Sequence, residues 1–139
     1  MLEIDVFNCA RSYLAREGFT VIQLVPPGGQ APFSISFKIE GAQRTVFPDI
    51  LAIRNGIIWV GEMKPKFDQA DHEKLILLHT LAEQEIRSLC ERVMKSDLSD
   101  HTANYVLCHS DSASLACPSI YQWIFQPGSQ DPVELHPLA

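Results

Sequence analysis

The sequence has no hydrophobic run long enough to cross a lipid bilayer. A membrane-spanning helix needs roughly 18 or more consecutive apolar residues, and no segment of the 139-residue chain approaches that length. The first residues, MLEIDVFNCARSYL, carry acids early and lack a basic stretch followed by an apolar one, unlike a signal peptide. The sequence therefore predicts a cytoplasmic protein with no membrane span and no secretion signal.

Closely spaced cysteine pairs are also missing. The four cysteines are scattered along the chain, at Cys9, Cys90, Cys108 and Cys117. None of them forms the CxxC spacing that zinc sites commonly use, and the Cys108-His109 pair has no second close pair to complete such a site. Scattered cysteines in a chain without a secretion signal are usually reduced, so we expect free thiols.

An excess of positive charge is absent as well. The net charge is −6, whereas general nucleic-acid binders usually have a basic surface. The acidity is uneven, because residues 33–74 hold six basic and six acidic side chains while residues 75–139 hold three and eight. The first part is therefore compatible with DNA binding, and the second part offers an acidic surface for a partner protein.

The composition is typical of one soluble α/β domain. Hydrophobic residues make up 46% of the chain and charged residues 20%, and the length allows one buried core. Periodicity predicts helices over 3–17 and, as one long helix, over 69–95. Apolar runs predict strands over 19–25, 33–39, 44–53, 56–64, 104–110 and 121–126. We expect a domain of residues 1–126 with a central mixed sheet flanked by the two helices, followed by a loosely held, Pro-rich tail of residues 127–139.

Charged residues interrupt an apolar hairpin in the segment VFPDILAIRNGIIWVGEMKPK, residues 46–66. Asn-Gly between two apolar runs strongly indicates a two-residue type I′ turn, which fixes the register of the two strands. With Asn55-Gly56 as the turn, Asp49 faces Glu62 across the hairpin. Lys64 lies on the same face as Glu62, because side chains alternate along a strand.

Two facing carboxylates on an apolar sheet predict a bound cation. Facing Cβ atoms lie about 4.5–5.5 Å apart, so the two charges repel unless a positive charge lies between them. Hard oxygen ligands favour Mg²⁺, with Mn²⁺ as a substitute. Glu3 is a further candidate ligand, because it lies on the apolar stripe of the first helix. In the alternative interpretation, the hairpin is exposed and its charged groups are simply solvated.

The order of these residues resembles the PD-(D/E)xK nuclease superfamily. Glu3 in the first helix, Pro48-Asp49 in one strand and Glu62-Met63-Lys64 at the end of the next follow the order of that superfamily. Within it, FPDILAIRNGIIWVGEMKPK is most similar to the virus-type replication-repair (VRR-NUC) nucleases and the Holliday-junction resolvases. It resembles the nuclease domain of type I restriction subunits almost as closely.

The resemblance implies a restriction-endonuclease-like fold with an αβββαβ core. It also implies a Mg²⁺-dependent DNA endonuclease of the repair, recombination or restriction type. Asp49, Glu62 and the backbone carbonyl of Met63 would hold the metal, and Lys64 would orient a water molecule or help to deprotonate it.

Three more residues are candidates for contact with DNA. Lys66 follows the Glu-x-Lys strand, and His72 and Lys74 open the predicted long helix, although each position also suits a solvated side chain. The apolar stripe of residues 75–93 is expected to be core, and its length also makes it a possible homodimer surface. The acidic balance implies modest intrinsic affinity for DNA, so a homodimer or a partner protein would supply targeting.

A second interpretation keeps the fold without the catalysis. A catalytically inactive nuclease-fold protein, acting as a DNA- or protein-interaction module, would account for the acidity beyond residue 75. Asp49, Glu62 and Lys64 are all present, which favours the enzyme, because an inactive site would be expected to lose one of them.

Overall fold

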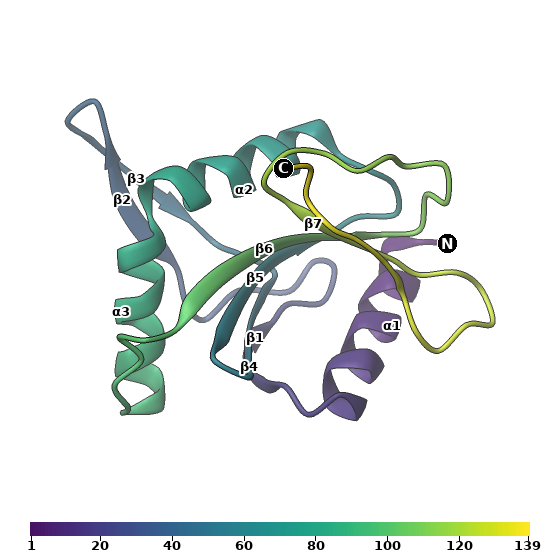
Figure 1. Ribbon diagram of the computed structural model, residues 1–139, viewed down its shortest axis with the longest axis horizontal. Coiled ribbons are helices and arrows are strands. Elements are labelled where there is room, and N and C mark those ends of the chain that lie inside the picture. Colours follow the sequence, from purple (N-terminus) through teal and green to yellow (C-terminus); the bar gives the residue numbers. More distant parts are fainter.

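A six-stranded mixed sheet forms the centre of the computed structural model, which describes all 139 residues (Figure 1). In chain order the elements are α1 (Glu3–Arg16), β1 (Thr20–Leu24), β2 (Ile35–Ile39), β3 (Ala42–Val46), β4 (Ile50–Arg54), β5 (Ile57–Met63), α2 (Gln69–Leu81), α3 (Glu83–Met94), β6 (Thr102–His109), β7 (Tyr121–Ile124) and β8 (Val133–Leu135). The strand order of the large sheet is β1-β4-β5-β6-β7-β8. Strands β5, β6 and β7 run parallel to one another, and the other neighbours are antiparallel. The α/β fold with a central mixed sheet is thus confirmed.

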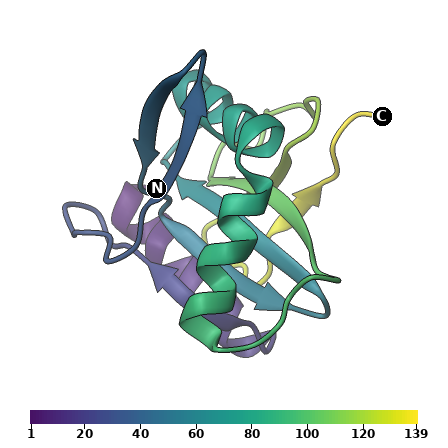
Figure 2. The ribbon, with the colours of Figure 1, turned by 90° about the vertical axis from the view of Figure 1, so that its left-hand side faces the viewer.

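Helices cover both faces of this sheet. Helix α1 packs on one face, while α2 and α3 pack on the other (Figures 1 and 2). Each face of the sheet has its own hydrophobic core, and alternate residues of β4 face the two cores. Leu51 is buried on the α2–α3 side and Ile50 on the α1 side. Because both faces of the central strands are buried, their sequences are continuous apolar runs. None of the helices combines the length and hydrophobicity needed to cross a membrane, and all four cysteines are free.

The predicted hairpin register is confirmed. Arg54 pairs with Ile57 and Ile50 pairs with Gly61. Asn55 and Gly56 have φ values of 52° and 76°, and positive φ at both central residues is what a type I′ turn requires. This turn brings the segment before β4 opposite the end of β5.

The single strand predicted for residues 44–53 is wrong, because it is two strands. Strand β3 ends at Val46 and pairs with β2 in a separate two-stranded sheet. Strand β4 begins at Ile50 in the large sheet. Pro48 lies between them and has no N–H to donate to a ladder. The chain therefore changes sheets at Phe47-Pro48-Asp49.

The long helix predicted for residues 69–95 is also two elements. It breaks at Ala82, whose φ and ψ are −130° and 11°, and α2 and α3 meet there at an angle (Figure 1). The break lets Leu75 of α2 and Ile86 of α3 both lie fully buried against the same core. The chain itself covers this stripe, so the exposed apolar face on which the homodimer prediction was based is not present there.

The C-terminal tail is not loosely held. Residues 133–135 form β8, which pairs antiparallel with β7. The Trp123 indole N–H donates to Glu134 Oε2 at 2.8 Å, and Arg16 of α1 forms an ion pair with Asp131 at 2.7 Å. The Pro content suggested a free tail, but these side-chain contacts fix residues 131–135 against the sheet and α1.

Candidate functional site

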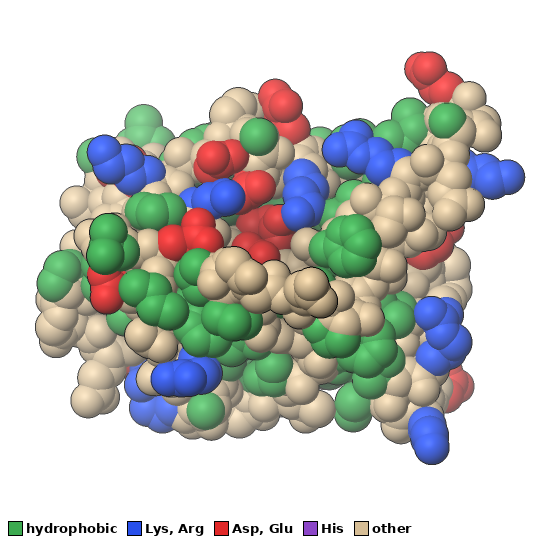
Figure 3. Space-filling view, turned by 180° about the vertical axis from the view of Figure 1, so that it is seen from behind, with side chains coloured by type: hydrophobic (Ala, Val, Ile, Leu, Met, Phe, Trp, Pro, Cys, Tyr) green, Lys and Arg blue, Asp and Glu red, His purple; other side chains and the backbone are tan.

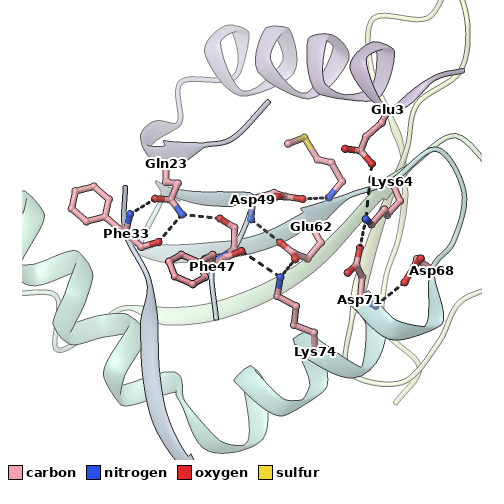
Figure 4. Close-up of polar contacts among 12 residues, drawn as sticks. Glu3, Gln23, Phe33, Phe47, Asp49, Glu62, Lys64, Asp68, Asp71 and Lys74 are labelled. Atoms are coloured by element: carbon pink, nitrogen blue, oxygen red, sulfur yellow. Dashed lines mark hydrogen bonds and ion pairs between the residues drawn. The ribbon is translucent and has the colours of Figure 1, made fainter. Parts of the chain in front are cut away.

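The Asp49 and Glu62 carboxylates, referred to below as the carboxylate pair, lie side by side where β4 begins and β5 ends (Figure 4). The Asp49 backbone N–H donates to Glu62 Oε2 at 2.6 Å, and the Met63 N–H donates to Asp49 Oδ2 at 3.0 Å. Each carboxylate is thus held by the backbone of the opposite segment. The convergence expected from the hairpin register is present.

The positive charge beside Glu62 comes from Lys74 of α2. The Lys74 ammonium is hydrogen-bonded to Glu62 Oε1 and donates to the Phe47 carbonyl at 3.3 Å. Lys74 is a predicted substrate contact, but its side chain points toward Glu62 (Figure 4). One ammonium thus lies between a side-chain oxygen and a backbone oxygen of the site.

Burial makes the carboxylate pair unfavourable when both groups are charged. The Glu62 side chain is only 3% exposed. Desolvation, together with the neighbouring Asp49 charge, raises the pKa of Glu62 to about 7, although Lys74 acts in the opposite direction. Desolvation also raises the pKa of Asp49, while the Met63 N–H and Lys74 oppose the rise. The pair therefore favours a bound proton or a bound cation.

Lys64 lies just beyond the end of β5, between two other carboxylates. Its ammonium is 4.0 Å from Glu3 Oε1 and 3.9 Å from Asp71 Oδ2. Partial burial lowers the pKa of Lys64, but the charges of Asp71 and Glu3 outweigh this effect and leave its pKa above the ordinary value. Lys64 is therefore a cation at neutral pH. Glu3 contacts this lysine instead of joining the carboxylate pair.

Asp71 is a site residue that sequence reasoning missed. It lies in the first turn of α2, where its N–H donates to Asp68 Oδ1 at 2.9 Å. Its Oδ2 atom is buried and accepts no hydrogen bond, and desolvation raises its pKa. The capping pattern Asp68-x-x-Asp71 could have located the start of α2 in the sequence. It could not have shown that Asp71 lies beside Lys64.

Gln23 of β1 was also missed, and it fixes the backbone next to Asp49. The side chain is buried, and its amide nitrogen donates to the Pro48 carbonyl at 2.7 Å and the Phe33 carbonyl at 3.1 Å. Its amide oxygen accepts from the Phe33 N–H at 2.7 Å. One amide thus joins the residue before Asp49 to the end of the 26–32 loop. A glutamine inside the apolar run FTVIQLV was the available signal.

Lys66 and His72 are not brought to the carboxylate pair. Lys66 is exposed and lies beside Met1 and the loop of residues 110–112. The His72 ring packs against Phe67 with its centroid 5.6 Å away, and both of its nitrogens are buried without a hydrogen-bond partner. Of the three candidates for substrate contact, only Lys74 lies at the site.

The donor set suits a hard divalent cation of the Mg²⁺ type. No three His, Cys, Asp or Glu side chains form a cluster that could hold a metal alone. Mg²⁺, however, is typically bound by one or two carboxylates, with water and substrate phosphate completing its shell. The oxygens of Glu62 and Phe47 already hold an ammonium. Met63 contacts the site through its N–H, and its carbonyl stays a predicted ligand.

One face of the molecule is mixed in charge. Figure 3 shows the molecule from behind the view of Figure 1, where acidic and basic side chains gather next to hydrophobic ones. A cavity of about 460 Å³ opens beside Asp49, between the 26–32 loop and Phe47. A ligand can thus approach the carboxylate pair from this cavity.

Comparisons of the chain with known protein families, with curated proteins and with solved structures found no match. The functional proposal therefore rests on the residues and their geometry.

Proposed function

We propose that the protein is a Mg²⁺-dependent endonuclease of the PD-(D/E)xK type, with a restriction-endonuclease-like fold, that hydrolyses phosphodiester bonds in DNA. The observation that carries the proposal is the carboxylate pair at the end of an apolar sheet, with the Lys64 cation two residues beyond Glu62. Placing two buried carboxylates together costs free energy. Binding of a divalent cation by the pair gives a reason for that cost.

The chemistry of phosphodiester hydrolysis fits these groups. A divalent cation held by carboxylates neutralises the developing negative charge and lowers the pKa of bound water. The Asp49 and Glu62 oxygens would hold it, with Mn²⁺ as a substitute. Their positions are fixed in advance, because the backbone N–H groups of Asp49 and Met63 orient the two carboxylates.

Lys64 supplies a fixed positive charge next to this site. Its ammonium is held between Glu3 and Asp71, and its raised pKa keeps it protonated at neutral pH. A protonated lysine cannot accept the proton of water. Its role is therefore to orient water or a phosphate oxygen and to stabilise negative charge. Asp71 and Glu3 position Lys64.

One observation favours the second function, a nuclease-fold module without catalysis that binds DNA or a partner protein. The chain's own Lys74 ammonium is hydrogen-bonded to Glu62 and already provides the compensating charge that a metal would bring. In this case the carboxylate pair and Lys74 form a structural ion cluster.

A cleavage assay separates the two functions. Single-stranded, duplex and branched DNA are incubated with the protein and Mg²⁺, Mn²⁺ or EDTA. We expect cleavage with either metal, none with EDTA, and none with Lys64→Ala. Lys38→Ala is the control, since this exposed lysine lies on β2 in the separate two-stranded sheet, and it should cleave like wild type. Folded wild-type protein that cleaves no DNA would favour the module, and full activity of Lys64→Ala would contradict the assigned site.

A further inference from the structure

The cavity beside Asp49 has features that the metal chemistry does not use. Its volume of about 460 Å³ falls in the range of small-molecule sites. Its lining residues are Val25, Gly29, Gln30, Ala31, Phe47 and Asp49. Three of these are apolar, one carries an amide, and none is basic. We refer to this cavity as the Phe47 pocket.

Phe47 presents an unusually exposed aromatic ring. It is 54% exposed, although Val46 before it is buried. Its backbone is held in place, because its carbonyl accepts from Lys74 and the next carbonyl, of Pro48, accepts from the buried Gln23 amide. The ring thus stands on a fixed backbone at the edge of the carboxylate pair, where a planar group could stack on it.

The opposite wall is also fixed. The Gly29 N–H donates to the Pro26 carbonyl at 2.9 Å, which closes a turn in the 26–32 loop. A side chain at Gly29 would meet Pro26 atoms at 3.0 Å, so the turn is tight. The other end of this loop is tied at Phe33, which exchanges two hydrogen bonds with Gln23. The Phe47 pocket is therefore built by the same amide that positions Asp49.

The charges on its walls disfavour an anionic occupant. The side chains that line the pocket include the Asp49 carboxylate and no Lys or Arg. The ammonium groups of Lys64 and Lys74 are instead paired with Asp71 and Glu62, although Lys74 also contacts the Phe47 backbone carbonyl. A phosphate would be repelled from the pocket and attracted to the lysines. A neutral, planar, partly polar group suits the ring of Phe47 and the Gln30 amide.

We propose that the Phe47 pocket binds an unpaired nucleobase next to the phosphate held at the carboxylate pair, so that the substrate is single-stranded DNA or the unpaired part of a branched DNA. This inference rests on the proposed nuclease function. A base inside a duplex is stacked and paired and cannot enter a pocket without leaving the helix. A single strand offers its bases freely for stacking on an aromatic side chain.

Binding without metal tests the inference separately from cleavage. A 12-nucleotide strand with a central 2-aminopurine, a fluorescent base analogue, is titrated in EDTA as a single strand and as a duplex. We expect wild type to bind the single strand more tightly and to quench its fluorescence. Phe47→Ala should weaken single-strand binding about 5- to 150-fold, the range for losing one base stack, and Phe47→Tyr should retain it. Val133→Ala is the matched control, because Val133 is also 54% exposed but lies on β8.

The outcomes separate this inference from the proposed function. Equal binding of single strand and duplex by wild type, or unchanged single-strand binding by Phe47→Ala, overturns the base pocket alone if wild type still cleaves DNA with Mg²⁺. Wild-type protein that neither binds nor cleaves either form of DNA overturns both proposals. Loss of single-strand binding in Phe47→Ala, with Phe47→Tyr and Val133→Ala unaffected, supports the pocket.

Discussion

Replacing Glu62 with glutamine should stabilise the metal-free protein above neutral pH. Glu62 has a pKa of about 7 in the folded protein, against an ordinary value of 4.5. At about 1.4 kcal/mol per pH unit, this difference corresponds to about 3 kcal/mol of folding free energy. Glu62→Gln keeps the shape of the side chain and an oxygen for the Asp49 N–H, but it cannot ionise.

The direction of this stability change follows from the raised pKa of Glu62. The folded protein holds the Glu62 proton more tightly than the unfolded chain does. The stability that this provides is complete below pH 4.5, decreases as the pH rises, and is lost once the pH passes about 7. Wild type and Glu62→Gln should therefore be similarly stable near pH 5. Near pH 8 the variant should be more stable by up to about 3 kcal/mol.

Urea denaturation in EDTA measures this difference, since the buried Trp59 and Trp123 report unfolding. His109, whose pKa burial lowers, titrates in both proteins, so its contribution cancels in the comparison. Glu85→Gln, the same change at an exposed position of α3, is the control and should show no such pH dependence. If Glu62→Gln were less stable than wild type at pH 8, the ion pair with Lys74 would be a net structural contact, and the argument from repulsion would fail.

Three further predictions concern the neighbours of the carboxylate pair. Lys64→Ala should bind Mn²⁺ with nearly wild-type affinity in calorimetry, because lysine offers the metal no lone pair at neutral pH. Complete loss of Mn²⁺ binding by the folded variant would contradict the electrostatic role proposed for Lys64. Lys74→Met should bind Mn²⁺ about tenfold more tightly than wild type, because the competing ammonium at Glu62 is removed. An unchanged or weaker affinity in the same titration would show that Lys74 does not compete with Mn²⁺ for Glu62. Gln23→Ala should lower the free energy of unfolding by about 1–3 kcal/mol, because it leaves the Phe33 N–H and the Pro48 carbonyl without their partner. Wild-type stability of this variant in urea would show that the Gln23 amide does not hold these two segments together.

Local sequence signals predicted the parts of the fold that depend on local geometry. Asn55-Gly56 specifies its turn through positive φ angles, so the register and the facing of Asp49 and Glu62 could be derived from the sequence. The break at Ala82 could not, because no Gly or Pro marks it and it follows from how α2 and α3 pack on the sheet. Strand β8 was missed for a similar reason, since its pairing with β7 overrides the Pro-rich composition of the tail.

The candidate site also has a part that the sequence predicts and a part that depends on long-range contacts. The carboxylate pair comes from one hairpin, whereas Lys74 reaches Glu62, and Asp71 reaches Lys64, only because α2 packs across the end of β5. Gln23 reaches Pro48 because β1 pairs with β4, and that pairing joins residues far apart in the sequence. Such long-range contacts leave no periodic signal in a single sequence. They explain why Lys74, and not Lys64, is the partner of Glu62.

The most direct test of the paired-carboxylate cation site is a set of thermal melts of wild type and Asp49→Asn with EDTA and with Mn²⁺. Wild type should gain stability from Mn²⁺, by about 2.7 kcal/mol at a hundredfold excess over the dissociation constant. Asp49→Asn removes the repulsion with Glu62 and one ligand of the site, so in EDTA it should be at least as stable as wild type and should gain nothing from Mn²⁺. A clearly destabilised Asp49→Asn that still gains stability from Mn²⁺ would contradict the cation site, and the nuclease proposal with it.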